Sequence, residues 1–140
     1  MLEESHVRRE KLNKLVELGL DPYPKETKRD TRCGDAVASF DFWSAEGRLL
    51  TLAGRLLTVR VHGGMIFADL ADESGKMQIA LKEDKIGAEA FAVFRDLVDP
   101  ADFVEVSGTL FLTKRGEKTL LISAWRPLAK ALLPLPEKWH

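Results

Sequence analysis

The residues best suited to chemistry lie in one predicted β-hairpin region, RVHGGMIFADLADESGKMQIAL, at positions 60–81. Alternation places two apolar sets on its inner face: Ile66, Ala68 and Leu70, then Met77, Ile79 and Leu81. The other face carries the aromatic ring of Phe67, with Arg60 and Gln78 on the neighbouring segments. An exposed ring flanked by an amide and a guanidinium matches what an unstacked nucleobase requires.

Such a set would divide base recognition between stacking and hydrogen bonding. Stacking on an aromatic side chain is worth about 1–3 kcal/mol whatever the base, whereas hydrogen bonds to the base edge select it. An amide donates and accepts, and a guanidinium only donates. Glu117, just past the TKRG turn, can reach the same rim and accept an N–H. We therefore predict a nucleic-acid-binding site made of Arg60, Phe67, Gln78 and Glu117.

Two of the predicted site residues, Phe67 and Glu117, also have another interpretation. With the phase of alternation reversed, Phe67 would belong to the core, although Asp69 shares its face and indicates that this face is wet. Gln78 and Arg60 also argue against the reversed phase, because each lies between apolar residues of its own strand. Glu117, judged from composition alone, is better explained as the solvated end of a hairpin.

Residues for catalysis or metal binding do not come together in the sequence. His6, His62 and His140 are scattered, and none has a second ligand at metal-binding spacing. Asp72 and Glu73 lie in a tight turn, where Asp is usually structural. The sequence has no phosphate-binding loop, nucleophile elbow or Cys–His pair. We expect no catalytic residue, no metal site and no cofactor in this chain.

Composition indicates one ordinary globular domain with an appendage. The 140 residues are 45% hydrophobic and 31% charged, as is usual for a globular protein. A chain of this length can bury enough apolar surface to fold without a disulfide or a metal. The formal charge of −1 argues against an indiscriminate binder of nucleic-acid backbone but allows a local patch. Cys33 is the single cysteine and favours a reducing compartment. Without a membrane-length apolar run or a signal peptide, the sequence predicts a cytoplasmic protein that binds no membrane.

The segment before residue 49 is predicted to pack on something larger than itself. Residues 4–19 have helical spacing and end at Gly19, which is suited to a C-cap. The apolar positions of this helix are Val7, Leu12, Leu15, Val16 and Leu18. Pro22 and Pro24 favour an extended arm after it. Residues 34–47 indicate a short helix or turn whose aromatic side chains need cover, namely Phe40, Phe42 and Trp43.

From Leu49 the sequence becomes rich in β-forming residues. Its periodicity predicts strands and one helix: strands over 49–61, 65–71, 77–82, 103–113 and 118–126, and the helix over 83–98. Gly54 suggests a bend or bulge in the long first strand. Three strands, a helix and two strands is the order of the OB-fold, a mainly β, five-stranded Greek-key barrel with a helix between strands 3 and 4, although the order alone also fits another small barrel. Such barrels bind oligonucleotides across strands 2 and 3.

The predicted domains follow from these elements. The N-terminal helix and extended arm occupy residues 1–48, and the barrel occupies 49–126. Residues 127–140 are interpreted as one helical turn and then a proline-stiffened linker.

Four segments together resemble the N-terminal domain of class II lysyl-tRNA synthetases. They are LNKLVELGLDPYP, TLAGRLLTVRVHGGMIFADLADESGKMQI, LFLTKRGEKTLLI and LAKALLPLPEKWH, in the family's order across nearly the whole chain. The opening LGLDPYP and the closing LPLPEKWH separate the chain from the aspartyl and asparaginyl relatives, which share the barrel. Ala124-Trp125 departs from the family, which often has a polar or acidic residue near the end of the fifth strand.

The resemblance implies an anticodon-binding OB-fold that recognises the anticodon loop of a lysine tRNA. Carried over by position, Phe67 would stack on the central anticodon uridine. Gln78 and Glu117 would read the edge of that base, and Arg60 would contact the anticodon bases or their backbone. Uracil suits this set, because its N3–H lies between two carbonyl acceptors.

The resemblance also implies a parent enzyme larger than this chain. The family continues after EKWH into a catalytic domain that attaches lysine to tRNA with ATP and Mg²⁺, so we expect an excised domain whose partners are tRNA and its own catalytic domain. Dimerisation would belong largely to the missing part, which leaves a monomer as the expectation for this chain.

Two further interpretations come from other functional classes. A free-standing OB protein that binds single strands without sequence preference would need several aromatic side chains and a basic groove, whereas the sequence indicates one clear aromatic on this face. A protein-interaction OB domain would use Phe67 to anchor a partner side chain. The equivalent domain of an aspartyl or asparaginyl enzyme is the third alternative.

Overall fold

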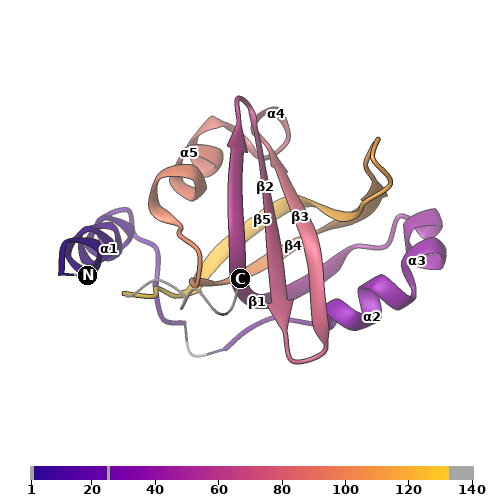
Figure 1. Ribbon diagram of the computed structural model, residues 1–140, viewed down its shortest axis with the longest axis horizontal. Helices are drawn as coiled ribbons and strands as arrows, with labels where there is room; N and C mark the ends of the chain where they lie inside the picture. Colours follow the sequence, from indigo (N-terminus) through magenta and orange to yellow (C-terminus); the bar gives the residue numbers. More distant parts are fainter. Residues whose placement is uncertain (1, 25, 133–140) are drawn as a thin grey trace.

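The computed structural model describes residues 2–24 and 26–132, which form a β-barrel with helices at its sides and ends (Figure 1). The helices are α1 Leu2–Glu17, α2 Cys33–Ala38, α3 Phe40–Glu46, α4 Glu83–Ile86 and α5 Ala88–Leu97. The strands are β1 Leu50–His62, β2 Met65–Asp72, β3 Gly75–Lys82, β4 Phe103–Leu112 and β5 Lys118–Ala129.

The five strands close into a barrel in the order β1-β2-β3-β5-β4. All neighbouring pairs are antiparallel except β3 and β5, which run parallel from Gln78↔Thr119 to Ala80↔Leu121. This arrangement and the helices between β3 and β4 confirm the predicted OB-fold. The predicted single helix between those strands is two helices, because Gly87 has a φ of 96° and interrupts the helical path.

Strand β1 belongs to both halves of the barrel, as its length suggests. It pairs with β4 from Leu50 to Arg55 and with β2 from Arg55 to His62. The expected irregularity falls between Leu56 and Thr58, where the register with β2 shifts, and not at Gly54. Gly54 meets a different requirement, because a Cβ there would collide with the carbonyl oxygen of Ala71.

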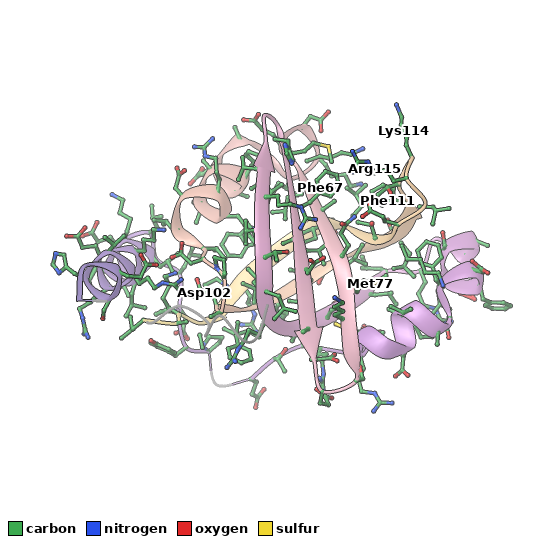
Figure 2. All side chains as sticks on the ribbon, in the orientation of Figure 1. Phe67, Met77, Asp102, Phe111, Lys114 and Arg115 are labelled. Atoms are coloured by element: carbon green, nitrogen blue, oxygen red, sulfur yellow. The ribbon has the colours of Figure 1, made fainter. Side chains whose placement is uncertain are left out.

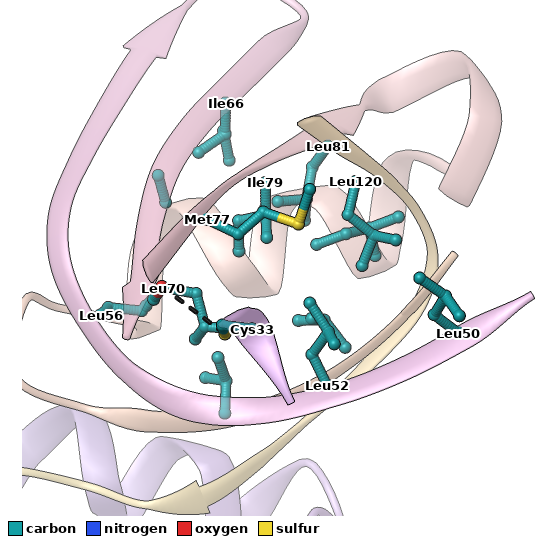
Figure 3. Packing of buried hydrophobic residues seen from close by; sticks show 14 of the residues in the cluster. Cys33, Leu50, Leu52, Leu56, Ile66, Leu70, Met77, Ile79, Leu81 and Leu120 are labelled. Atoms are coloured by element: carbon teal, nitrogen blue, oxygen red, sulfur yellow. Dashed lines mark hydrogen bonds between the residues drawn. The ribbon is translucent and has the colours of Figure 1, made fainter. Parts of the chain in front are cut away.

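The inner face of the barrel is the core, and its side chains come from every strand (Figure 3). The six apolar residues predicted to face inward on the β2–β3 hairpin are all buried: Ile66, Ala68, Leu70, Met77, Ile79 and Leu81. Because side chains alternate along a strand, this burial directs Phe67 and Gln78 to the outer face. The reversed phase, with Phe67 in the core, is therefore wrong.

Helices α2 and α5 add side chains from outside the sheet to the same core. Cys33 and Ala36 of α2 are fully buried, as are Phe91 and Phe94 of α5. The helical spacing over 83–98 groups Phe94 with Ile86, Ala90, Val93 and Leu97 on one side, whereas the buried side chains of α5 are Phe91 and Phe94. In α3, Phe40 is buried as predicted and Trp43 is partly covered, whereas the expected cover for Phe42 is absent and that side chain is 71% exposed.

Polar contacts, more than apolar ones, hold α1 on the barrel. Only Leu15 of the predicted apolar positions is fully buried, and Val7, Val16 and Leu18 are exposed. Its C-terminus is capped at Gly19, with a φ of 82° and an N–H that donates to the Val16 carbonyl oxygen at 3.0 Å.

Two cations of α1 make the contacts that its apolar face does not. Arg8, only 3% exposed, donates to the carbonyl oxygens of Pro100 and Ala131 at 2.9 and 3.4 Å. Lys11 pairs with Asp99 at 2.6 Å. The helix is thus fixed at the end of the barrel where β5 leaves the sheet.

The arm before α2 is tied to the barrel by Glu105. Its carboxylate accepts from the Thr27 hydroxyl at 2.9 Å, the Lys28 backbone N–H at 2.8 Å and Arg126 at 3.0 Å. Burial alone would raise the pKa of Glu105, but these donors outweigh it and lower that pKa. The carboxylate therefore stays ionised and keeps the arm against β4.

The C-terminal end of the barrel differs from the expectation. The helical turn predicted from Pro127 is wrong, because β5 continues to Ala129 and Val104 pairs with Pro127. The strand therefore extends past the predicted limit of the barrel at residue 126. The proline-stiffened segment at 133–140 lies outside the described residues. Among the residues described, none of the helices has the length and hydropathy to span a bilayer.

Close approach of strands β4 and β5 requires glycine at position 108. A Cβ at Gly108 would collide with the carbonyl oxygen of Leu121, so we expect Gly108→Ala to lower the free energy of unfolding by about 1–3 kcal/mol in urea titrations. Gly64→Ala is the matched control, since its nearest neighbour would be Glu83 Oε1 at an ordinary 3.6 Å. Equal stability of the two variants would contradict the proposed packing.

The Cys33 thiol should be inert while the barrel is folded. Burial, reinforced by Asp72, raises the pKa of Cys33 to about 12, and its thiol donates to the Leu70 carbonyl oxygen at 3.8 Å (Figure 3). We expect no alkylation by iodoacetamide at pH 8 in buffer and rapid alkylation in denaturing urea, followed by intact-mass measurement. Reaction at equal rates in both solutions would show that Cys33 is accessible in the native state.

Candidate nucleic-acid interface

An open groove of about 850 Å³ lies on the outer face of the barrel, between the β2–β3 hairpin and the β4–β5 hairpin. The four residues predicted to form the binding site all line it: Arg60, Phe67, Gln78 and Glu117. These residues come from β1, β2, β3 and the turn before β5, so the fold brings together positions as far apart as 60 and 117.

Phe67 lies on the side of the groove formed by the β2–β3 hairpin, and its ring is half-buried (Figure 2). Its ladder partners are Arg60 on β1 and Ala80 on β3. Ala80 is fully buried although it points to the outer face, and its small side chain leaves room for the larger ring beside it. The ring therefore lies on the outer face of the sheet and lines the groove, as a stacking platform must.

Hydrogen bonds set the orientation of the Gln78 amide. Its Nε2 donates to the Thr119 hydroxyl at 2.9 Å, and its Oε1 accepts from Arg60 Nη2 at 3.2 Å. Thr119 is fully buried and its own hydroxyl donates to the Glu117 carbonyl oxygen at 3.1 Å. The amide thus carries its acceptor toward Arg60 and its donor toward β5.

Arg60 is held over the outer face by a second set of contacts. Its Nη1 donates to the Thr58 hydroxyl at 3.1 Å and lies 3.7 Å from the Asp69 carboxylate. The Thr58 hydroxyl in turn donates to Asp69 at 2.8 Å. Because Arg60 remains exposed, a guanidinium with five N–H groups keeps donors available to a ligand in the groove.

Glu117 stands at the rim, in the tight turn between β4 and β5. Its backbone N–H donates to the Thr113 hydroxyl at 3.0 Å, and the same hydroxyl donates to its carboxylate at 3.3 Å. Gly116, with a φ of 83°, allows the turn. The Glu117 side chain is exposed. This position fits both interpretations of Glu117, the solvated end of a hairpin and a contact to a base.

Cations that the sequence did not single out also line the groove. Lys82, Lys114 and Arg115 join Arg60, which sets four lysine or arginine side chains against the carboxylates of Asp69 and Glu117. The groove is therefore locally basic, whereas the formal charge of the chain is −1. Lys114 and Arg115 lie in the TKRG turn, and the structure places their side chains in the same groove as Phe67 (Figure 2).

The sequence indicated one clear aromatic side chain on this face, Phe67, but the structure places a second one, Phe111, in the groove. Phe111 of β4 is half-buried and lines the groove, with Lys82 Nζ 5.9 Å from its ring centroid. Alternation over 103–113 groups Leu112 with Val104, Val106 and Leu110 on one face of the strand, but Leu112 is exposed and also lines the groove. Leu110, two residues earlier, is buried in the core, so the alternation continues along β4 and fails only at Leu112, the last residue of the strand.

Comparison with known proteins places this barrel in a family. Residues 50–128 match the tRNA anticodon family, described as OB-fold nucleic acid binding domains. The chain belongs to this family. The match covers every strand of the OB-fold domain, and the groove lies within it.

Relatives are similar to this OB-fold domain and its N-terminal helix together. Lysine–tRNA ligase 2 of Methanosarcina mazei is 42% identical over 131 residues, which are 93% of this chain and 26% of that protein. Lysine–tRNA ligase of Roseiflexus sp. strain RS-1 is 45% identical over 93% of this chain and 27% of its own. Lysine–tRNA ligase of Clostridium perfringens strain SM101 is 39% identical over 99% and 27% respectively.

These relatives confirm the resemblance to lysyl-tRNA synthetases that the four sequence segments indicated. The OB-fold domain and its helix span about a quarter of the length of the curated relatives they match.

Thr119 should control the stability of the amide network. Thr119→Val keeps the shape of the buried side chain but removes the acceptor for Gln78 Nε2, so we expect a loss of about 1 kcal/mol in the free energy of unfolding. In ¹⁵N-correlated NMR spectra, the Gln78 side-chain amide should shift toward a solvent-exposed position. Thr109→Val is the matched control on β4, because the Thr109 hydroxyl makes no hydrogen bond to another described residue. An unmoved Gln78 amide would contradict the network.

Proposed function

We propose that this domain binds the anticodon loop of a lysine tRNA for a lysine–tRNA ligase. One observation carries the proposal: a half-buried ring, a fixed amide, a guanidinium and a carboxylate line a single basic groove. The family match and the names of the relatives supply the class of ligand.

In this proposal the central anticodon uridine lies flat on Phe67, whose ring faces the groove. Stacking alone accepts any base, so selection comes from the groups around the ring. Glu117 can accept the N3–H that uracil has and that cytosine lacks, while Gln78 and Arg60 supply donors for its carbonyl oxygens. Two bonds fix the Gln78 amide before the ligand arrives: its Oε1 accepts from Arg60 at 3.2 Å, and one N–H of its Nε2 donates to Thr119 at 2.9 Å, which leaves the second N–H for the base.

Charge supports the same assignment. The four cations of the groove would neutralise phosphates of the loop, whereas the chain as a whole carries a formal charge of −1 and offers little to a nonspecific backbone. We therefore propose weak binding by the isolated domain, since it contacts a few nucleotides and not the whole tRNA.

The catalytic step is proposed for a part of the enzyme outside this chain. ATP and Mg²⁺ would serve lysine activation there, and the domain described here would position the tRNA. Within residues 2–24 and 26–132, no three His, Cys, Asp or Glu side chains gather in a way that could hold a metal ion, so we assign no step of that chemistry to them. We further propose a cytoplasmic, homodimeric parent enzyme, for which the unpaired Cys33 is suited to a reducing compartment.

Titration with anticodon stem-loops tests the proposal. A stem-loop with the lysine anticodon should bind more tightly than one with cytidine at the central position, because Glu117 then loses its donor and faces a ring nitrogen acceptor. Phe67→Ala should weaken the cognate complex by about 1–3 kcal/mol, measured as the dissociation constant by fluorescence anisotropy.

Phe42→Ala is the matched control, because Phe42 is equally aromatic, 71% exposed and outside the groove. It should leave the dissociation constant unchanged. Equal affinity for both stem-loops would favour a generic single-strand binder, and no affinity for either would favour a protein-interaction domain.

A further inference from the structure

We propose that Phe111 and Lys82 form a second nucleotide subsite in the groove, which takes a nucleotide flanking the base on Phe67. The inference rests on the proposed function and deepens it. Phe111 would stack on the flanking base, and Lys82 would contact a phosphate of the same loop.

The fold places Phe111 in line with the residues that surround the first base. Across the sheet, Gln78 of β3 pairs with Thr119 of β5, which pairs with Phe111 of β4. Phe111 is therefore two strands from Gln78, or roughly 10 Å at the usual strand spacing. Phe67 lies two residues along β2 from Asp69, which is the ladder partner of Gln78 in this row. A loop that crosses from Phe67 past Gln78 toward β4 reaches Phe111 with a neighbouring nucleotide.

The ring of Phe111 lies in the groove and not in the core of the barrel. It is half-buried, it lines the same groove as Phe67, and it is absent from the hydrophobic core of the barrel. An outward aromatic at this place is poorly explained by barrel packing, because its ladder partner on β5 is the polar Thr119. Stacking of a base would cover apolar surface that the folded domain leaves open.

Lys82 gives the subsite its charge. Its Nζ lies 5.9 Å from the Phe111 centroid, near the outer limit of about 6 Å for a cation–π contact, so the interaction holds it weakly. Within the described part of the chain, no carboxylate forms an ion pair with Lys82. A phosphate can therefore recruit this cation without breaking an ion pair.

The experiment measures anticodon stem-loop binding to the 140-residue chain by fluorescence anisotropy. Phe111→Ala should raise the dissociation constant about tenfold, and Phe111→Trp should keep the dissociation constant close to that of the wild-type chain, because it keeps a flat ring. Two further stem-loops carry an abasic nucleotide at either position next to the central base. With one of them the effect of Phe111→Ala should disappear, while Phe67→Ala should still weaken binding.

Salt dependence tests the role of Lys82 separately. Lys82→Gln should make the slope of log affinity against log salt less steep by about 0.7, the value for one phosphate of a single strand. Lys76→Gln is the matched control, since Lys76 is exposed on the outer face of the same strand but outside the groove. Equal slopes for both variants would overturn the phosphate contact.

The outcomes separate this inference from the proposed function. If the wild-type chain discriminates the central base and Phe67→Ala weakens binding, but Phe111→Ala matches Phe42→Ala, the second subsite is wrong and the anticodon proposal stands. If the wild-type chain does not discriminate the central base, the anticodon proposal fails first. A circular dichroism melt of Phe111→Ala, compared with Phe111→Leu, must show that both variants are folded. Weak binding by both, with native melts, supports stacking, because leucine keeps apolar volume without a flat face.

Discussion

The parallel contact between β3 and β5 is the constraint on which the groove depends. Only the run from Gln78↔Thr119 to Ala80↔Leu121 joins these strands, yet it closes the barrel and brings the β4–β5 hairpin beside the β2–β3 hairpin. The same contact carries the hydrogen bond from Gln78 to Thr119. The contact that closes the barrel therefore also orients the Gln78 amide. A folded barrel thus holds this side chain of the groove in position before a ligand binds.

Burial on one face of the sheet determines what the other face can do. Ile66, Ala68 and Leu70 are all fully buried, so a slip of one residue in β2 would expose them and bury Phe67 in their place. The ring is consequently kept outward by the core and not by contacts of its own. This separation lets the outer face vary in chemistry, such as a ring, an amide and a guanidinium, without cost to the barrel.

Charge is distributed in a way that suits a selective binder. The groove collects four cations while the chain as a whole carries a formal charge of −1, so attraction to phosphate is local and not general. Outside the groove, buried charged side chains form ion pairs that connect parts of the fold. Lys130, with a side chain only 1% exposed, bridges Asp99 and Asp102, and Lys11 on α1 pairs with the same Asp99. These pairs join the helix to the segment that follows β5, and none of their residues lines the groove.

The sequence alone determined the order of the strands, the inward set on the β2–β3 hairpin and hence the outward position of Phe67, because alternation is a local property of the chain. It could not determine which distant strands pair, since the contact of Gln78 with Thr119 joins residues 41 positions apart. For that reason Phe111, Lys82 and the hairpin cations became part of one groove only in the tertiary structure. The burial of Phe91 and the exposure of Leu112 likewise depart from the periodic patterns of their own segments. Each depends on packing between segments, which a periodic pattern read along one segment does not contain.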